Sequence, residues 1–173
     1  MAVREIVSLP EPVLRKKARK VTDFGPELQT LIDDMVETMR VAPGVGLAAP
    51  QVDASVRVIV VEYGEEDEEE TAVIPPKLYT VVNPEITRFS TESEVGSEGC
   101  LSIPGFAGDV ERPLGITIKG LNRRGQPIRI KAEGWLARIF QHEIDHLDGV
   151  LFIDRAERVW KLEGETFQVS LAD

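Results

Sequence analysis

The sequence predicts an α+β fold in which antiparallel or mixed sheets pack around a central helix, with a further amphipathic helix nearer the N-terminus. Strand-like runs lie between two helical segments instead of alternating with them, which favours separate helices and sheets. Apolar stripes of helical period mark residues 26–40 and 135–148, and two strand-like runs flank a glycine turn within residues 116–132. The 173 residues can bury a core and contain neither a repeat nor a linker, so we expect one domain over residues 1–173.

The segment 26–40 is the predicted N-terminal amphipathic helix. Pro26 suits a first helical turn, because the N–H that proline lacks has no helical partner there. Apolar residues recur at steps of three and four and form one stripe: Leu28, Leu31, Ile32, Met35 and Met39. The Pro43–Gly46 run ends this helix.

Strands are predicted over residues 56–63 and 78–82, which are rich in Val and Ile. Asn83-Pro84 marks a turn after the second of them. Between the two strands lie six consecutive acidic residues, 65–70, which we interpret as a solvated loop. This run carries most of the net charge of −10, because the other 24 acidic and 20 basic residues leave only −4.

The later part of the chain predicts a hairpin followed by a helix. Residues 116–121 and 127–132 flank a turn in which Gly125 supplies the unusual backbone angle. The helix 135–148 follows, and Gly149 is placed to cap its C-terminus. We expect a short final helix over residues 154–164.

Composition excludes several classes of protein. A pI of about 4.8 and the absence of a direct nucleic-acid motif argue against a nucleic-acid partner. No window approaches the roughly 18 apolar residues of a membrane span, so no membrane contact is expected. The first residues lack a signal-peptide stretch, and one cysteine cannot form an internal disulfide. We therefore expect a cytoplasmic protein, or an organellar one if a transit peptide has been removed.

The helix 135–148 carries the pattern HExxH. His142 and His146 are one helical turn apart, so both imidazoles can reach one metal ion. Glu143 is about 100° further round the helix and can lean over an open position of the metal without being a ligand. The chain has only two histidines, and both fall in this pattern. We therefore interpret the helix as a carrier of two metal ligands and a general base.

The third ligand is not decided by the helix alone. No histidine follows His146, although Glu157, Glu163 and Glu165 remain alternatives downstream. The only cysteine, Cys100, lies upstream, and a thiolate with two imidazoles suits a borderline-soft divalent metal. A buried apolar thiol and a nucleophilic cysteine are the competing interpretations of this residue.

A third segment, residues 44–51, combines two glycines and two alanines, which allow close approach of another backbone. It lacks the Gly-Lys-Ser/Thr ending of a phosphate loop. Gln51 at its end offers an amide N–H that could steady an oxyanion.

Together these segments resemble peptide deformylase. That family is marked by Gly-x-Gly-x-Ala-Ala-x-Gln, Glu-Gly-Cys-x-Ser and Gln-His-Glu-x-Asp-His, in that order. The chain matches all three without a broken position, at residues 44–51, 98–102 and 141–146. The resemblance extends from Pro10 to Phe152 and therefore covers most of the chain.

The resemblance implies a hydrolase that removes the N-formyl group from the initiator methionine of nascent polypeptides. Cys100, His142 and His146 would hold one divalent metal ion, with Fe²⁺ first and Zn²⁺, Ni²⁺ or Co²⁺ able to substitute. A metal-bound water would attack the formyl carbon with Glu143 as general base and acid.

The resemblance also assigns residues to the substrate. Gln51 and the backbone N–H of Leu101 would face the developing oxyanion. The segments at Val45, Gly46 and Gly99 would hold an N-formylmethionyl peptide in an extended pose. Three residues near the histidines on the helix are nominated to line the methionine pocket or its rim: Trp135, Arg138 and Ile139. A transient association with the ribosome is allowed by this function, although no basic docking helix is evident at the C-terminus.

One departure from the family is visible after the cysteine motif. Many bacterial members carry Glu-x-Arg where this chain has Gly105-Phe106-Ala107, as in the organellar-type variant. This affects the expected contacts beyond methionine and leaves the metal chemistry unchanged. The alternative functions are an HExxH metallopeptidase and a non-catalytic deformylase relative that binds nascent N-termini.

Overall fold

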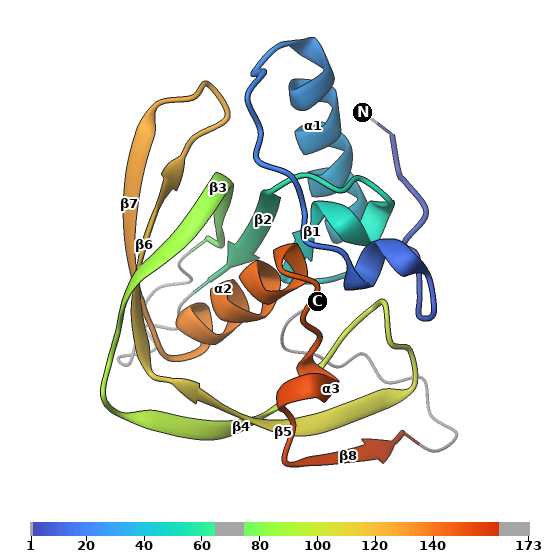
Figure 1. Ribbon diagram of the computed structural model, residues 1–173, viewed down its shortest axis with the longest axis vertical. Coiled ribbons are helices and arrows are strands. Elements are labelled where there is room, and N and C mark those ends of the chain that lie inside the picture. Colours follow the sequence, from blue (N-terminus) through green and yellow to red (C-terminus); the bar gives the residue numbers. More distant parts are fainter. Residues whose placement is uncertain (1, 65–74, 163–173) are drawn as a thin grey trace.

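The computed structural model describes residues 2–64 and 75–162 and contains two antiparallel sheets with helices packed against them (Figure 1). The predicted α+β class with antiparallel sheets is confirmed. The acidic run 65–70, predicted as a solvated loop, lies outside the described residues. Among the described residues, no helix combines the length and the apolar character needed to cross a membrane.

The larger sheet has five strands in the order β1-β2-β3-β6-β7, and the smaller has three in the order β4-β5-β8. Each of β1 and β4 therefore forms an edge of its sheet. The strands of the larger sheet are β1 (Gly46–Ala48), β2 (Val58–Tyr63), β3 (Lys77–Phe89), β6 (Gly115–Leu121) and β7 (Pro127–Glu133). Those of the smaller sheet are β4 (Ser93–Gly99), β5 (Phe106–Pro113) and β8 (Arg158–Lys161).

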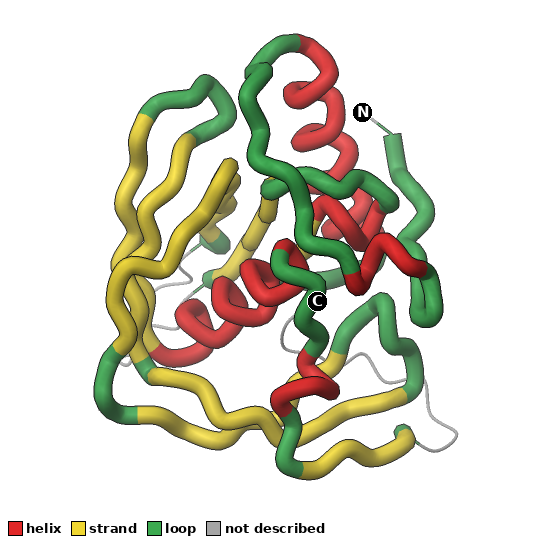
Figure 2. Tube along the Cα trace, in the orientation of Figure 1, coloured by secondary structure: helices red, strands yellow, loops and turns green. Residues whose placement is uncertain are grey.

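The helices are α1 (Pro26–Val41), α2 (Gly134–Leu147) and the single turn α3 (Phe152–Arg155), with 3-10 turns at Pro12–Arg15 and Ala49–Val52. Helices α1 and α2 lie on opposite faces of the larger sheet, and α3 lies against β5 of the smaller sheet. Side chains of β2 alternate between two core clusters, Val58 and Val60 toward α1, and Ile59 and Val61 toward α2. Figure 2 shows α2 in the middle of the molecule, between the larger sheet and the smaller sheet. Both faces of β2 are thus buried, which explains its unbroken Val and Ile run.

Strand β3 is longer than predicted, because it continues through the expected turn at Asn83-Pro84. The pairing with β6 shifts in register between Val82 and Glu85, and Asn83 adopts a left-handed backbone with φ 52°. The Asn83 side chain accepts from the N–H of Val21 (2.8 Å) and donates to its C=O (3.0 Å). Asn83-Pro84 therefore forms a bulge within one strand and not a turn between two strands, because the contact with Val21 stabilises the irregular backbone.

The predicted final helix over residues 154–164 is wrong for the part that the structure describes. The chain forms only the short α3 and then the strand β8, which pairs with β5. A short helix with weak apolar periodicity is only marginally stable by itself. The backbone N–H and C=O groups of this segment instead form hydrogen bonds with the neighbouring strand β5. The predicted hairpin is present as β6 and β7, with Gly125 at φ 82°.

Candidate metal centre

The helix α2 presents both histidines and Glu143 to the interior. The imidazole rings of His142 and His146 have centroids 5.1 Å apart, as one helical turn requires. All three side chains are buried. Burial, followed by the charges of His142 and Arg112, lowers the pKa of His146 well below its usual value. A neutral imidazole is the form that binds a metal.

Cys100 joins the histidines from the turn that follows β4. One ligand atom of each of Cys100, His142 and His146 lies within 4.8 Å of the others. The Cys100 Sγ to His146 Nε2 distance is 3.3 Å. Tetrahedral ligands at metal–nitrogen and metal–sulfur distances of about 2.1 and 2.3 Å would be about 3.6 Å apart. The fold therefore brings Cys100 of one sequence motif together with the two histidines of another, at metal-site spacing.

A buried nitrogen of His142 that has no hydrogen-bond partner also indicates a metal site. His142 Nδ1 is 2.9 Å from Oε1 of Glu98, whereas His142 Nε2 is buried without a hydrogen-bond partner. A buried polar atom without a partner is unfavourable unless a ligand satisfies it. One soft thiolate and two imidazoles suit a divalent transition metal such as Zn²⁺ or Fe²⁺.

Glu98 belongs to the candidate site through its contact with His142, and the sequence interpretation assigned it no role. Its carboxylate is fully buried and accepts from Arg112 Nε (2.6 Å) and Nη2 (2.8 Å) as well as from His142. Burial alone would raise the pKa of Glu98, but the hydrogen bonds from Arg112 and His142 hold it well below its usual range. The available signal was its place in the Glu-Gly-Cys segment, because metal-bound histidines usually donate to a carboxylate.

Gln51 lies beside the sulfur of Cys100. Its Nε2 is 3.6 Å from Cys100 Sγ and donates to Ser102 Oγ at 3.2 Å. Its Oε1 accepts from the N–H of Ala48 at 3.0 Å, which fixes the orientation of the amide. Leu101 directly follows Cys100 in the same turn. Both predicted oxyanion residues thus lie next to the candidate metal ligand.

The carboxylate of Glu143 lies against Gly46 of β1. A Cβ added to Gly46 would be 2.6 Å from Glu143 Oε2, which is closer than a Cβ and an oxygen can approach. The missing side chain therefore leaves the space that the carboxylate occupies. The C=O of the preceding Val45 accepts from the N–H of Glu62 in β2 at 2.9 Å. Backbone groups alternate in direction along a strand, so those of Gly46 are directed to the open edge.

The three nominated pocket residues have different surroundings. Trp135 is 41% exposed, whereas Ile139 is buried in the core between α2 and the larger sheet. Arg138 is buried, and its Nη1 is 2.6 Å from Oε2 of Glu98. Trp135 and Arg138 both line a cavity of about 140 Å³ that also touches Gly96 and Arg112.

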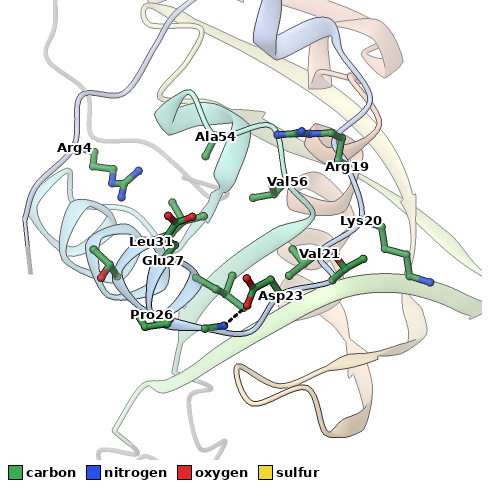
Figure 3. Close-up of a pocket in the computed structure, with 14 residues that line it drawn as sticks. Arg4, Arg19, Lys20, Val21, Asp23, Pro26, Glu27, Leu31, Ala54 and Val56 are labelled. Atoms are coloured by element: carbon green, nitrogen blue, oxygen red, sulfur yellow. Dashed lines mark hydrogen bonds between the residues drawn. The ribbon is translucent and has the colours of Figure 1, made fainter.

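A larger cavity of about 1030 Å³ lies away from this centre, beside the first turn of α1 (Figure 3). Residues such as Arg4, Arg19 and Glu27 line it. None of the predicted site residues is among its lining residues. The larger cavity and the cluster of metal-ligand side chains therefore lie in different places, and the candidate site is the one that combines these side chains.

Comparison with known proteins places the chain in a recognised group. Residues 3–161 match the family model described as Polypeptide deformylase. The peptide deformylase of Natranaerobius thermophilus is 48% identical over 163 residues, which are 94% of this chain and 98% of that protein. The peptide deformylase of Halothermothrix orenii is 51% identical over 160 residues, covering 92% and 97% of the two chains.

Solved structures show the same likeness. The crystal structure of peptide deformylase from Thermotoga maritima has a TM-score of 0.81 and 42% identity, covering 91% of this chain and 100% of that one. A class I type b peptide deformylase from Acinetobacter baumannii, solved with Met-Ala-Ser bound, has a TM-score of 0.80 and 38% identity. That match covers 89% of this chain and 98% of the other.

Proposed function

The chain belongs to the peptide deformylase family and is thus a metal-dependent hydrolase of nascent polypeptides, and we propose that Cys100, His142 and His146 hold its metal while Glu143 moves the proton. The observation that carries the assignment of ligands is the convergence of these three residues within 4.8 Å of one another. The reaction splits the C–N bond of an N-formyl group and releases formate and a free amine.

The metal that we propose is Fe²⁺, as the family resemblance implies, with Zn²⁺, Ni²⁺ or Co²⁺ able to replace it. One thiolate with two imidazoles suits each of these divalent ions. When bound, such an ion makes water acidic enough to attack at neutral pH and polarises the formyl carbonyl. Cys100 and the two histidines come from different elements, so the fold sets the distance between them.

Glu143 is the residue that we assign to proton transfer. It is fully buried, and Gly46 leaves the space that its carboxylate occupies. Glu143 takes the proton of the attacking water and delivers it to the departing amine nitrogen. Gln51 Nε2 and the backbone N–H of Leu101 donate to the formyl oxygen as its negative charge grows.

The peptide substrate is proposed to bind as an added strand between two sheet edges. Gly46 lies in the edge strand β1, and Gly99 ends the edge strand β4. An extended peptide can pair with such an edge through its backbone groups. Occupation of the A. baumannii enzyme by Met-Ala-Ser supports a methionyl peptide as the ligand of this chain as well.

The methionine side chain requires an apolar surface, for which we retain Trp135 and Ile139. The half-exposed Phe106 stands where many bacterial members have a charged segment. We therefore propose weak selection for residues beyond methionine.

The remaining proposals are a single catalytic domain over residues 1–173 organised around α2, action in the cytoplasm, where nascent chains emerge, and transient contact with the ribosome.

The test of this function is release of formate from formyl-Met-Ala-Ser. Protein loaded with Fe²⁺ or Ni²⁺ under argon should turn over, a chelated sample should not, and metal added back should restore activity. Turnover that survives full chelation would favour a cysteine nucleophile instead. Cleavage of casein without formate release would favour an HExxH peptidase. A protein that holds one metal and releases no formate would be a binding relative.

Replacing Gly46 by Ala is expected to reduce kcat for formate release about 100-fold, because the added methyl group must displace the Glu143 carboxylate. Metal content should stay at the wild-type level, since none of the three proposed ligands changes. Gly115→Ala is the matched control, because a Cβ there meets its nearest neighbour at 3.7 Å. Equal kcat for the two alanine variants would contradict the proposed contact.

Air is expected to inactivate the Fe²⁺ form faster than the Ni²⁺ or Zn²⁺ form. Fe²⁺ and the Cys100 thiolate can both be oxidised, whereas Zn²⁺ has no redox chemistry. The measurement is the half-life of formate release in aerated buffer for protein loaded with each metal. Equal half-lives for all three would contradict oxidation as the cause.

A further inference from the structure

We propose that Arg138 is a positioning residue for the metal centre, which it serves by tying Glu98 to the helix that carries His142. The inference rests on the proposed metal site. It assigns to Arg138 a role different from the pocket or rim contact expected from the sequence.

Four donors surround the carboxylate of Glu98. Oε1 accepts from Arg112 Nη2 (2.8 Å) and His142 Nδ1 (2.9 Å). Oε2 accepts from Arg112 Nε and Arg138 Nη1, both at 2.6 Å. Because Arg112 already forms a bidentate pair, charge balance does not require a second arginine at this site. Arg138 therefore calls for a different explanation.

The elements that carry these residues supply that explanation. Glu98 and Arg112 lie on the neighbouring strands β4 and β5, so their pair only holds the smaller sheet together. Arg138 lies on α2, four residues before His142, and connects the helix directly to Glu98. After His142, Asp145 makes a further connection by accepting from Arg112 Nη1 at 2.9 Å. The helix is thus tied to the sheet on both sides of His142.

The guanidinium of Arg138 is itself held in one place. Nη1 also donates to the C=O of Val110 (2.8 Å), and Nη2 donates to the C=O of Glu94 (2.7 Å). The ring of Trp135 lies 5.3 Å from its central carbon. These contacts reach α2, β4 and β5 together, and a lysine with a single ammonium group could not reproduce them.

Gly96 provides the space for this arrangement. A Cβ on Gly96 would be 2.8 Å from Cζ of Arg138 and 2.9 Å from its Nε and Nη2. Gly96 has no left-handed backbone angle, so alanine there would act through contact with the guanidinium and not through backbone strain.

The consequence concerns the spacing of the metal ligands. Cys100 follows β4, whereas His142 and His146 belong to α2. The end of β4 and the helix must therefore keep a fixed position relative to each other for all three ligands to reach one metal ion. Glu98 is two residues before Cys100 and contacts His142 Nδ1, and its tie to α2 therefore maintains both the distance and the ring orientation. Without Arg138 the ligands are less preorganised, and the metal should dissociate faster.

The experiment measures metal loss in Arg138→Met, Arg138→Lys and Gly96→Ala. Co²⁺- or Ni²⁺-loaded protein is mixed with excess chelator, and dissociation is followed by absorbance. We expect about tenfold faster dissociation in each variant, at the lower end of the effect of outer-shell changes, and an altered Co²⁺ visible spectrum. The KM for formyl-Met-Ala-Ser should stay within about twofold of wild type, since in this role Arg138 does not touch the peptide.

Matched controls separate this role from general damage. Gly115→Ala tests the addition of a methyl group to a strand, and Arg129→Met tests loss of an exposed arginine. Both should dissociate metal at the wild-type rate. If Arg138→Met does not fold, Gly96→Ala and Arg138→Lys decide the question.

Unchanged dissociation rates in the folded variants would overturn the proposal. A raised KM with normal metal retention would likewise overturn it and make Arg138 a substrate contact. The dissociation readout is independent of formate release. A wild-type protein that holds metal but releases no formate would therefore contradict the proposed function alone.

Discussion

Replacing Glu143 by Gln is expected to lower kcat for formate release about 10³-fold, within the range that general acid–base catalysis contributes. Glutamine has the same shape and can fill the space beside Gly46, so packing should be preserved. It cannot accept the proton of the attacking water, because its amide nitrogen is not basic. The rate of formate release from formyl-Met-Ala-Ser at saturating substrate is the measurement.

The control for this variant is Glu133→Gln, at the exposed end of β7 immediately before α2. It removes a carboxylate next to the same helix without entering the buried centre, and its kcat should equal that of the wild type. Both variants should retain one metal per chain. Activity of Glu143→Gln within tenfold of the wild type would exclude Glu143 as the principal proton carrier.

Replacing Cys100 by Ser is expected to weaken metal binding by more than about 100-fold, since even outer-shell changes cost 10–100-fold. A hydroxyl remains protonated at neutral pH and is a poor ligand for a borderline-soft metal, whereas the thiolate is a strong one. Formate release at limiting metal should fall in proportion to metal content. Metal analysis after gel filtration and titration with a chelator measure the effect.

The single cysteine makes this result easy to interpret. A thiol reagent titrates Cys100 directly, and bound metal should protect it from alkylation. Circular dichroism should match the wild type, because serine differs from cysteine by one atom in a small apolar cluster. Full metal content in Cys100→Ser would remove Cys100 from the ligand set and leave its interpretation as a buried thiol.

Local patterns predicted the elements whose stability is mainly local. The hairpin of β6 and β7 could be predicted from its turn residues and isoleucines, because neighbouring segments pair without a long loop. The place of β8 in the smaller sheet could not be predicted in this way, because β8 pairs with β5 across some fifty intervening residues. The Asn83-Pro84 signal was likewise misread, since the contact with Val21 that converts it into a bulge is distant in sequence.

In the metal centre, too, local sequence patterns predicted some features and only the tertiary structure showed the others. By itself the sequence determined the two histidines and the glutamate at helical spacing, because one helix sets their relative directions. It left the third ligand open until family resemblance indicated Cys100. Only the tertiary structure decided that Glu98 contacts His142 and that Arg138 turns inward to Glu98. Helical spacing places Arg138 near His142, but the position of β4 determines that the guanidinium of Arg138 pairs with the carboxylate of Glu98.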